Sequence, residues 1–213
     1  MTTLEEIKSG QLYDCSPENV PEYLNEKILE CKELQYEFNN SRPSEFEKRD
    51  EIIRKMFASV GKNCYIEPPF YANWGCNMHV GDNFYANFSL TVVDDADIFI
   101  GDNVMIAPNV ILATGTHPIS PELRERVYQY NLPIHIGDRV WIGAGSIILP
   151  GVTIGNDSVI GAGSVVTKDI PSGVVAVGNP CKVLREINDR DYEYYYKDKR
   201  IPFKVERSKN EKQ

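Results

Sequence analysis

Residues 136–166 read IGDRVWIGAGSIILPGVTIGNDSVIGAGSVV, and this stretch decides the fold. Every sixth residue from Ile136 to Val166 is isoleucine or valine. A period of six with β-branched residues at one phase is typical of a parallel β-helix, in which three hexads make one triangular coil of about 18 residues. Since a single coil cannot bury its inner face alone, the coils must stack.

The same period extends toward the N-terminus, with two-residue shifts after Met78 and Ile98 and a long break after Leu112. Before the break, the apolar positions are Val60, Ile66, Ala72, Met78, Val80, Ala86, Val92, Ile98, Ile100, Ile106 and Leu112. About five coils therefore fit between residues 60 and 171. The alternative, a sandwich of ordinary strands, requires a period of two and irregular turns. We therefore predict a β-helix.

Glycine often follows the apolar position, as in Gly81, Gly101, Gly137, Gly143, Gly155 and Gly161. We expect the backbone to turn at these glycines with a dihedral angle that other side chains resist.

The first third of the chain is predicted to be helical. Ser16 and Pro17 fit the start of a helix that ends near Asn39. Ser44 and Glu47 fit a capping box at the start of a second helix. The predicted fold class is therefore mainly β, with N-terminal α-helices and a short helical tail.

We divide the chain into three parts. Residues 1–59 form an N-terminal helical segment, and residues 60–187 form the β-helix, from which a loop at 118–135 is extruded. Residues 188–213 form a C-terminal tail with a short helix and a frayed end. Long loops inside compact folds are usually functional or disordered, so the loop at 118–135 marks a candidate site.

Composition excludes several classes of protein. The 213 residues carry a net charge of −8, which disfavours binding to nucleic acid. No apolar run approaches 18 residues, and the start lacks the basic and apolar regions of a secretory signal. The five cysteines are scattered and without CxxC spacing, as expected of free thiols in a reducing compartment. We expect a cytoplasmic protein without nucleic-acid or membrane partners.

Three further segments point to a family. They are ThrGlyThrHisProIle (114–119), ValTrpIleGlyAlaGly (140–145) and ValGlyAsnProCysLys (177–182). Together with the hexads, they resemble the maltose and galactoside O-acetyltransferases among the hexapeptide-repeat acyltransferases. The similarity covers nearly the whole chain, including TyrGluPheAsn (36–39) and IleAsnAspArgAsp (187–191). It implies a left-handed β-helix and a homotrimer that transfers acetyl from acetyl-CoA to a sugar or glycoside hydroxyl.

His117 is the candidate catalytic residue. It lies at the root of the predicted loop, and imidazole titrates near neutral pH, which suits a general base. A sugar hydroxyl must lose its proton as it attacks a thioester carbonyl. The segment around His117 matches the family, and this match implies the catalytic role.

The resemblance also implies acceptor-binding residues. Asn87 and Asp95 match positions at the family's active centre, and Asn73 stands where the galactoside enzyme has a serine. The family's N-terminal aspartate has no clean counterpart, and Asp14 is the candidate for it. These departures leave the identity of the sugar open.

The spacing of Asn87 and His117 bears on assembly. Asn87 falls seven residues after its coil start and His117 seventeen, which is about half a turn apart in a coil of about 20 residues. The two side chains therefore lie on different sides of one prism. Because the resemblance places both at one active centre, we predict a site between the subunits of a cyclic trimer.

On the donor side, the resemblance places Trp141 against the pantetheine arm of CoA, with Ala144 and Ala162 bonding its amides. A cationic group near the end of the β-helix suits the CoA phosphates. It consists of Thr167, Lys168, Lys182 and Arg185. His79 and His135 lack zinc-ligand spacing with His117, so we expect no metal site.

Other functions stay open at this point. A related acyltransferase could act on a nodulation-type oligosaccharide, an antibiotic or serine. A hexapeptide protein could also be a non-catalytic scaffold, because one fold hosts many functions. A scaffold has no need of His117, Trp141 or the cationic group, so the sequence favours the sugar acetyltransferase.

Overall fold

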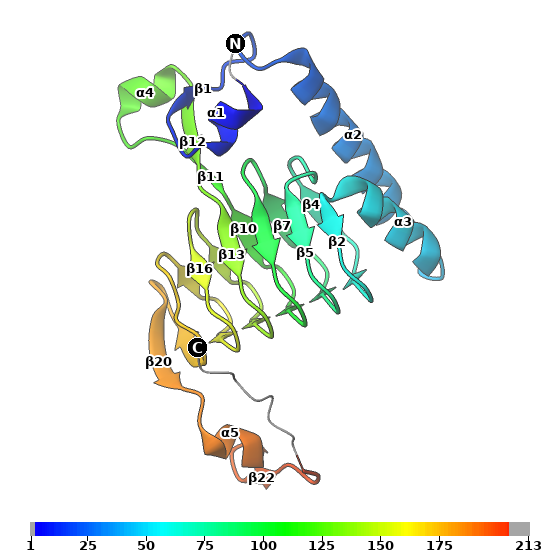
Figure 1. The fold of residues 1–213 in the computed structure, drawn as a ribbon, viewed down its shortest axis with the longest axis vertical. Coiled ribbons are helices and arrows are strands. Elements are labelled where there is room, and N and C mark those ends of the chain that lie inside the picture. Colours follow the sequence, from blue (N-terminus) through cyan, green and yellow to red (C-terminus); the bar gives the residue numbers. More distant parts are fainter. Residues whose placement is uncertain (1–2, 205–213) are drawn as a thin grey trace.

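The computed structural model describes residues 3–204. The body of the molecule is a parallel β-helix, in which short strands of successive coils stack into three sheets (Figure 1). This arrangement confirms the mainly β architecture predicted from the hexads.

Each sheet collects one strand from every complete coil. Sheet 1 contains β2 (Ser59–Val60), β5 (Met78–Val80), β8 (Ile98–Ile100), β13 (Ile134–Ile136) and β16 (Thr153–Ile154). Sheet 2 contains β3 (Tyr65–Ile66), β6 (Tyr85–Ala86), β9 (Met105–Ile106), β14 (Trp141–Ile142), β17 (Val159–Ile160), β19 (Val174–Val177) and β20 (Lys182–Glu186). Sheet 3 contains β4 (Phe70–Ala72), β7 (Leu90–Val93), β10 (Ile111–Ala113), β15 (Ile147–Ile148) and β18 (Val165–Val166).

The chain visits the sheets in the same order in every complete coil, so the turns also stack in columns. The first corner lies between sheets 1 and 2, the second corner between sheets 2 and 3, and the third corner between sheet 3 and the next strand of sheet 1. These columns bring residues of successive coils next to one another.

The strand register shows the length of each coil. In sheet 1, Ser59 pairs with His79 and His79 with Phe99, so the first two coils repeat after 20 residues. Phe99 then pairs with His135 across the long break, and His135 pairs with Thr153 only 18 residues later. Within residues 3–204, the strands form five complete coils, and β19 belongs to an incomplete sixth.

The predicted inward positions form the core of the β-helix. All of the hexad positions except Val60 are buried, and Val60 is partly buried against the same cluster. Full burial of one valine or isoleucine side chain contributes about 1.5–3 kcal/mol. The six-residue pattern is therefore confirmed as the inward-facing pattern.

The glycines after these positions are required for a different reason than predicted. None of the six predicted glycines has a positive φ. A Cβ atom on Gly81 would instead lie 2.7 Å from the carbonyl carbon of Gly101, and one on Gly143 would lie 2.5 Å from the nitrogen of Ala162. Close approach between successive coils excludes a side chain here. Positive φ occurs at other glycines, including Gly145 and Gly163.

In the part of the chain that the structure describes, three helices precede the β-helix. Helix α1 (Leu4–Lys8) begins at a capping box formed by Thr3 and Glu6, which the sequence analysis did not identify. Helices α2 (Glu22–Asn39) and α3 (Phe46–Met56) lie beside the first coils (Figure 1). The side chain of Gln35 bonds both the N–H and the C=O of Ala72, at 2.9 and 2.8 Å, and so joins α2 to β4.

Both predicted helix starts are wrong, although the predicted end of α2 is confirmed. The Ser16 hydroxyl donates to Asp14 Oδ1 at 2.6 Å, and α2 begins only after Pro21. Helix α3 has no side-chain cap, because the residue before it is Glu45, whose carboxylate accepts from the Arg42 N–H at 2.7 Å.

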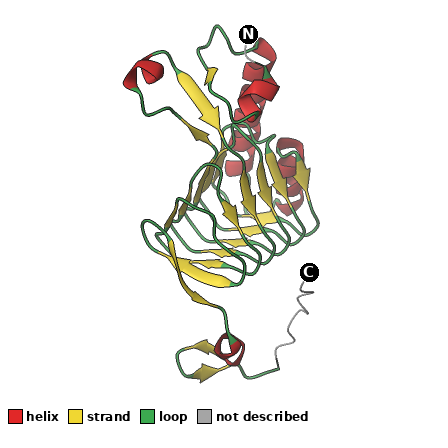
Figure 2. Ribbon diagram, turned by 60° about the vertical axis from the view of Figure 1, so that its left-hand side comes forward, coloured by secondary structure: helices red, strands yellow, loops and turns green. Residues whose placement is uncertain are grey.

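The predicted loop is an ordered excursion from the third corner. It contains β11 (Gly115–Thr116), α4 (Pro121–Glu125) and β12 (Tyr128–Asn131), and β1 (Tyr13–Asp14) pairs antiparallel with β12. The excursion projects beyond the stacked coils (Figure 2). Residues 134 and 135, which we placed in the loop, belong to β13 of sheet 1.

The C-terminal region begins with β20, which pairs antiparallel with β19. The predicted short helix is α5 (Asp189–Glu193), and a hairpin of β21 (Tyr194–Tyr196) and β22 (Lys199–Arg200) follows it. The predicted frayed end lies outside the described residues. Across residues 3–204, no helix is both long and apolar enough to cross a membrane.

Candidate functional site

His117 follows β11 at the third corner, and its ring has a defined partner. Nδ1 lies 2.9 Å from the carbonyl oxygen of Tyr128, which belongs to β12. A carbonyl oxygen only accepts hydrogen bonds, so Nδ1 carries the proton of the neutral ring and Nε2 keeps the lone pair. The exposed ring can therefore take a proton through Nε2.

Asp95 lies at the same corner and is only 8% exposed. Its Oδ1 accepts from Asn73 Nδ2 at 2.8 Å and from Trp74 Nε1 at 2.9 Å. Burial raises the pKa of Asp95, while those two hydrogen bonds and the nearby His117 oppose the rise. Its Oδ2 faces Gly115, where a Cβ atom would lie 2.5 Å away. One oxygen of the carboxylate is thus fixed by the protein, and the other faces β11.

Asp14 lies beside the residue that holds His117, because it pairs with Tyr128 in the β1–β12 register. Hydrogen bonds from the hydroxyl and the N–H of Ser16 lower the pKa of Asp14. The structure thus brings four predicted site residues to the third corner, and we call them the acceptor-side cluster. They are Asp14, Asn73, Asp95 and His117.

Asn87 is not part of this cluster. It follows β6 at the second corner, where its N–H donates to the carbonyl of Ile106 at 2.8 Å. Its side-chain oxygen accepts from the N–H of Phe88, also at 2.8 Å. Since Asn87 follows a strand of sheet 2 and His117 follows a strand of sheet 3, the two residues lie at different corners of the prism.

Three predicted donor-side residues lie on sheet 2 and the second corner, and we call them the donor-side strip. Trp141 on β14 is 51% exposed, and Ala144 and Ala162 are exposed in successive turns. The N–H of Gly163 donates to the carbonyl of Ala144 at 2.8 Å, and nothing lies within 4 Å of a Cβ atom built on Gly163. The strip thus offers an aromatic ring beside open backbone, as a slender ligand arm requires.

The four predicted cationic-group residues lie near the end of the β-helix. Thr167 and Lys168 follow β18 on sheet 3, and Lys182 and Arg185 lie on β20. The Arg185 guanidinium makes a two-pronged ion pair with Asp191, both contacts at 2.7 Å. These contacts use the Nη1 and Nη2 end of the guanidinium and leave its Nε–H and one Nη2 hydrogen to bind a phosphate.

Two family models match the chain. The maltose acetyltransferase hexapeptide capping motif matches residues 7–61, and the bacterial transferase hexapeptide (six repeats) matches residues 133–168. The galactoside O-acetyltransferase of Escherichia coli (strain K12) is 56% identical over 208 residues, which are 98% of this chain and 98% of that protein. This chain belongs to the galactoside and maltose O-acetyltransferase family. The resemblance predicted from the sequence is therefore confirmed.

Solved structures of the family agree with the fold. A galactoside acetyltransferase in complex with coenzyme A is 54% identical, with a TM-score of 0.89 over 94% of this chain and 98% of that one. A maltose O-acetyltransferase from Clostridium difficile 630 is 49% identical, with a TM-score of 0.84 over 89% of this chain and 99% of that one. These likenesses confirm the predicted fold class, a mainly β protein built on a parallel β-helix of hexapeptide repeats.

In this family member, the sequence analysis missed residues that shape the acceptor-side cluster. Trp74 and Gly115 contact Asp95, and the side-chain nitrogen of Gln129 lies 3.3 Å from the Cβ position of Gly115. Tyr128 orients His117 through its carbonyl. The segment around His117 contained Gly115, but the other three come from β12 or from the turn after β4, which no local pattern joins to His117.

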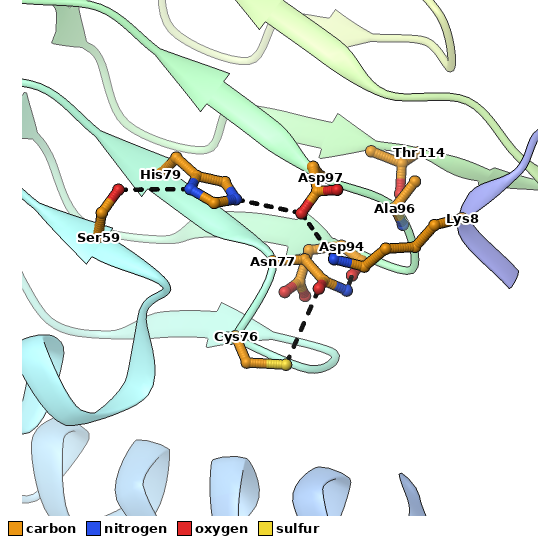
Figure 3. A network of polar contacts seen from close by, with 9 residues as sticks. All are labelled: Lys8, Ser59, Cys76, Asn77, His79, Asp94, Ala96, Asp97 and Thr114. Atoms are coloured by element: carbon orange, nitrogen blue, oxygen red, sulfur yellow. Dashed lines mark hydrogen bonds and ion pairs between the residues drawn. The ribbon is translucent and has the colours of Figure 1, made fainter. Parts of the chain in front are cut away.

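The other two histidines have structural partners on the outer face of sheet 1. His79, Phe99 and His135 stack ring on ring, with centroid distances of 4.6 and 4.9 Å. The carboxylate of Asp97 bonds both His79 and Lys8, which joins α1 to the β-helix (Figure 3). His79 belongs to strand β5 and His135 to strand β13. Among residues 3–204, no group of three side chains could hold a metal ion.

Proposed function

We propose that this protein is an acetyl-CoA-dependent O-acetyltransferase that acetylates a hydroxyl of a sugar or glycoside. One observation carries the proposal in this family member: His117 has Nδ1 bonded to a carbonyl and keeps Nε2 as a base beside Asp95. The named relatives are a galactoside and a maltose O-acetyltransferase, which supports a sugar as the acceptor.

The proposed chemistry is direct transfer with His117 as general base. Nε2 removes the proton of the acceptor hydroxyl as that oxygen attacks the acetyl carbonyl carbon. The thioester C–S bond then breaks, and the CoA sulfur leaves and takes the proton from the imidazolium. Products are the O-acetyl sugar and CoA. The Tyr128 carbonyl keeps the ring in the tautomer that this step needs.

The acceptor-side cluster would bind the sugar. Asp95 Oδ2 makes no hydrogen bond to the described residues and can accept from a sugar hydroxyl, while its Oδ1 stays fixed by Asn73 and Trp74. Asp14 lies on β1, which pairs with β12 on the side away from β11, and its carboxylate would close the site there. Asn87 would complete the site from the second corner.

The donor-side strip would hold the CoA arm. Trp141 can pack along the pantetheine, and the open backbone at Ala144 and Ala162 can bond its amides. Thr167, Lys168, Lys182 and Arg185 would bind the phosphates. The relative solved in complex with coenzyme A supports CoA as the donor's carrier.

We further propose a cytoplasmic homotrimer with its sites between subunits. The acceptor-side cluster lies at the third corner, whereas Asn87 and the donor-side strip lie at the second corner or on sheet 2. In a cyclic trimer, the second corner of one chain can face the third corner of its neighbour. This packing would unite the two half-sites in three equivalent clefts.

An acceptor panel tests the function. The protein is incubated with acetyl-CoA and a thiol reporter, together with a galactoside, maltose, glucose, a nodulation-type oligosaccharide, serine or an aminoglycoside antibiotic. We expect release of CoA with a sugar, and none without an acceptor. Release with serine or the antibiotic alone would replace the sugar proposal, and no release with any acceptor would favour a scaffold. The His117→Ala variant is the matched control.

A further inference from the structure

Asp94 is a fully buried carboxylic acid beside the acceptor-side cluster, and the proposed chemistry does not use it. It follows β7 at the third corner, with 0% exposure. Its Oδ1 accepts from the N–H of Asn73 at 3.0 Å and from the N–H of Trp74 at 2.9 Å. Burying a carboxylate is costly, and these two bonds offset part of the cost.

Asp95, the next residue, also bonds Asn73 and Trp74. The side chains of Asn73 and Trp74 both donate to Asp95 Oδ1, at 2.8 and 2.9 Å. Asp94 therefore binds the backbone N–H groups of this turn, while Asp95 accepts hydrogen bonds from the two side chains of the same turn. Any movement of the turn moves both donors that fix the Asp95 carboxylate.

Asp94 is itself fixed in place. Its carbonyl oxygen accepts from the side-chain nitrogen of Asn77 at 2.7 Å, and Asn77 is only 1% exposed (Figure 3). Nearby, the Thr114 hydroxyl bonds the N–H of Ala96 at 2.9 Å and the carbonyl of Val93 at 2.8 Å. The corner that carries Asp94 and Asp95 is thus a rigid support for a binding carboxylate.

We propose that Asp94 is a positioning residue of the acceptor site, which holds the Asn73–Trp74 turn so that Asp95 presents one oxygen to the acceptor. This inference rests on the proposed function. Asp94 does not touch the acceptor and acts only through Asp95 and Asn73. Its burial raises its pKa to about 6.

Steady-state kinetics of two variants test the proposal. Asp94→Ala removes both bonds to the turn, so we expect the KM for the acceptor to rise about tenfold or more, with the KM for acetyl-CoA within twofold of wild type. Asp94→Asn keeps an oxygen that can accept both N–H groups, so it should retain most of the acceptor affinity. A purely structural role would lower the fraction of active enzyme without separating the two KM values.

Asp102→Ala is the matched control. Asp102 Oδ1 also accepts a backbone N–H of the preceding coil, that of Asp82 at 2.7 Å, but it does so at the first corner. We expect this variant to leave the acceptor KM unchanged. An unchanged acceptor KM in folded Asp94→Ala would overturn the inference. If that variant does not fold, a crystal structure of Asp94→Asn with Asp95 and Asn73 displaced, yet with normal acceptor KM, would overturn it.

The same measurements separate this inference from the proposed function. Turnover of a sugar by the wild type establishes the function whatever the Asp94 variants do. A wild type without transferase activity overturns the proposed function and this inference together.

Discussion

The His117 imidazole can act as a base only through Nε2, because Nδ1 faces the Tyr128 carbonyl at 2.9 Å. If His117 is the general base that we propose, its replacement by alanine removes that base from the reaction. We expect His117→Ala to lower kcat by roughly 10²–10⁴-fold, with little change in the KM for acetyl-CoA. Initial rates at saturating acceptor measure the effect.

His117→Asn separates the loss of the base from a loosening of the excursion. The asparagine amide can still donate to the Tyr128 carbonyl, but it cannot take a proton at neutral pH. We therefore expect His117→Ala and His117→Asn to lower kcat by the same factor. Near-normal turnover in either one would remove His117 from the mechanism.

A Gly115→Ala variant tests whether the close packing of β11 on Asp95 matters for acceptor binding. A Cβ atom there would lie 2.5 Å from Asp95 Oδ2, so Gly115→Ala must displace the carboxylate or the strand. We expect the KM for the acceptor to rise severalfold and the KM for acetyl-CoA to stay unchanged. If both KM values keep their wild-type size, Asp95 Oδ2 does not bind the acceptor.

Protonation of Asp94 should also make the free energy of unfolding depend on pH, and the direction of the pKa shift sets the sign of this dependence. Burial raises its pKa from 3.8 to about 6, so the folded protein binds this proton more tightly than the unfolded chain. The corresponding stabilisation is complete below pH 3.8 and is lost as the pH rises through 6. Its size is about 3 kcal/mol.

Asp94→Asn cannot titrate at this position. The stability of wild type minus that of the variant should therefore fall by up to about 3 kcal/mol between pH 4 and pH 7. Urea denaturation at several pH values measures this difference. A difference that does not change with pH would show that Asp94 does not titrate in this range.

At the scale of elements, the strands were predictable and the helix starts were not. The hexad period is local, and stacking the coils buries the same phase every time, so even Ala72 and Ala86 were placed inside. A helix start depends on competition between nearby groups. Ser16 bonds Asp14 instead of capping a helix, and a serine before a proline does not reveal that choice.

The acceptor-side cluster was only partly predictable for the same reason. The resemblance named its four members, but the β1–β12 pairing joins residues more than 100 positions apart. The carbonyl that orients His117 and the turn that holds Asp95 depend on such pairings. Backbone groups and buried supports like Asp94 leave no periodic signal in a single sequence.

Strand β20 and helix α5 share the ion pair of Arg185 with Asp191, and this pair tests the phosphate role of the cationic group. Lys182→Ala and Arg185→Ala should weaken CoA more than dephospho-CoA, because the extra phosphate loses a cation. Asp191→Asn should release Arg185 and preserve or strengthen CoA binding. Calorimetric titration measures all three, and equal losses for both ligands would leave only a general effect of charge.

At the scale of the whole molecule, Asn87 and His117 lie at different corners of one chain. Asn87 follows a strand of sheet 2, and His117 follows a strand of sheet 3, so a rigid prism keeps them at different corners. If both act on one acceptor, only a neighbouring chain can bring them together. Activity should then require the oligomer, whose mass light scattering can measure.

Subunit mixing tests the shared site directly. Asn87→Ala and His117→Ala chains, each inactive alone, are unfolded together and refolded as mixed trimers. A cleft works when its Asn87 comes from a His117→Ala chain and its His117 comes from an Asn87→Ala chain. With equal amounts and random assembly, about a quarter of the clefts meet both conditions. We therefore expect about a quarter of wild-type activity.

The control is the same procedure applied to each variant alone, which should restore nothing, because every cleft then carries the same defect. A site contained within one chain predicts no recovery in the mixture either, since each chain keeps its own defective residue. Trimers of the expected mass without recovered activity, formed from variants that are each inactive alone, would therefore overturn the shared site. A fully active monomer would exclude the shared site more directly, because it has no neighbour to supply the missing half.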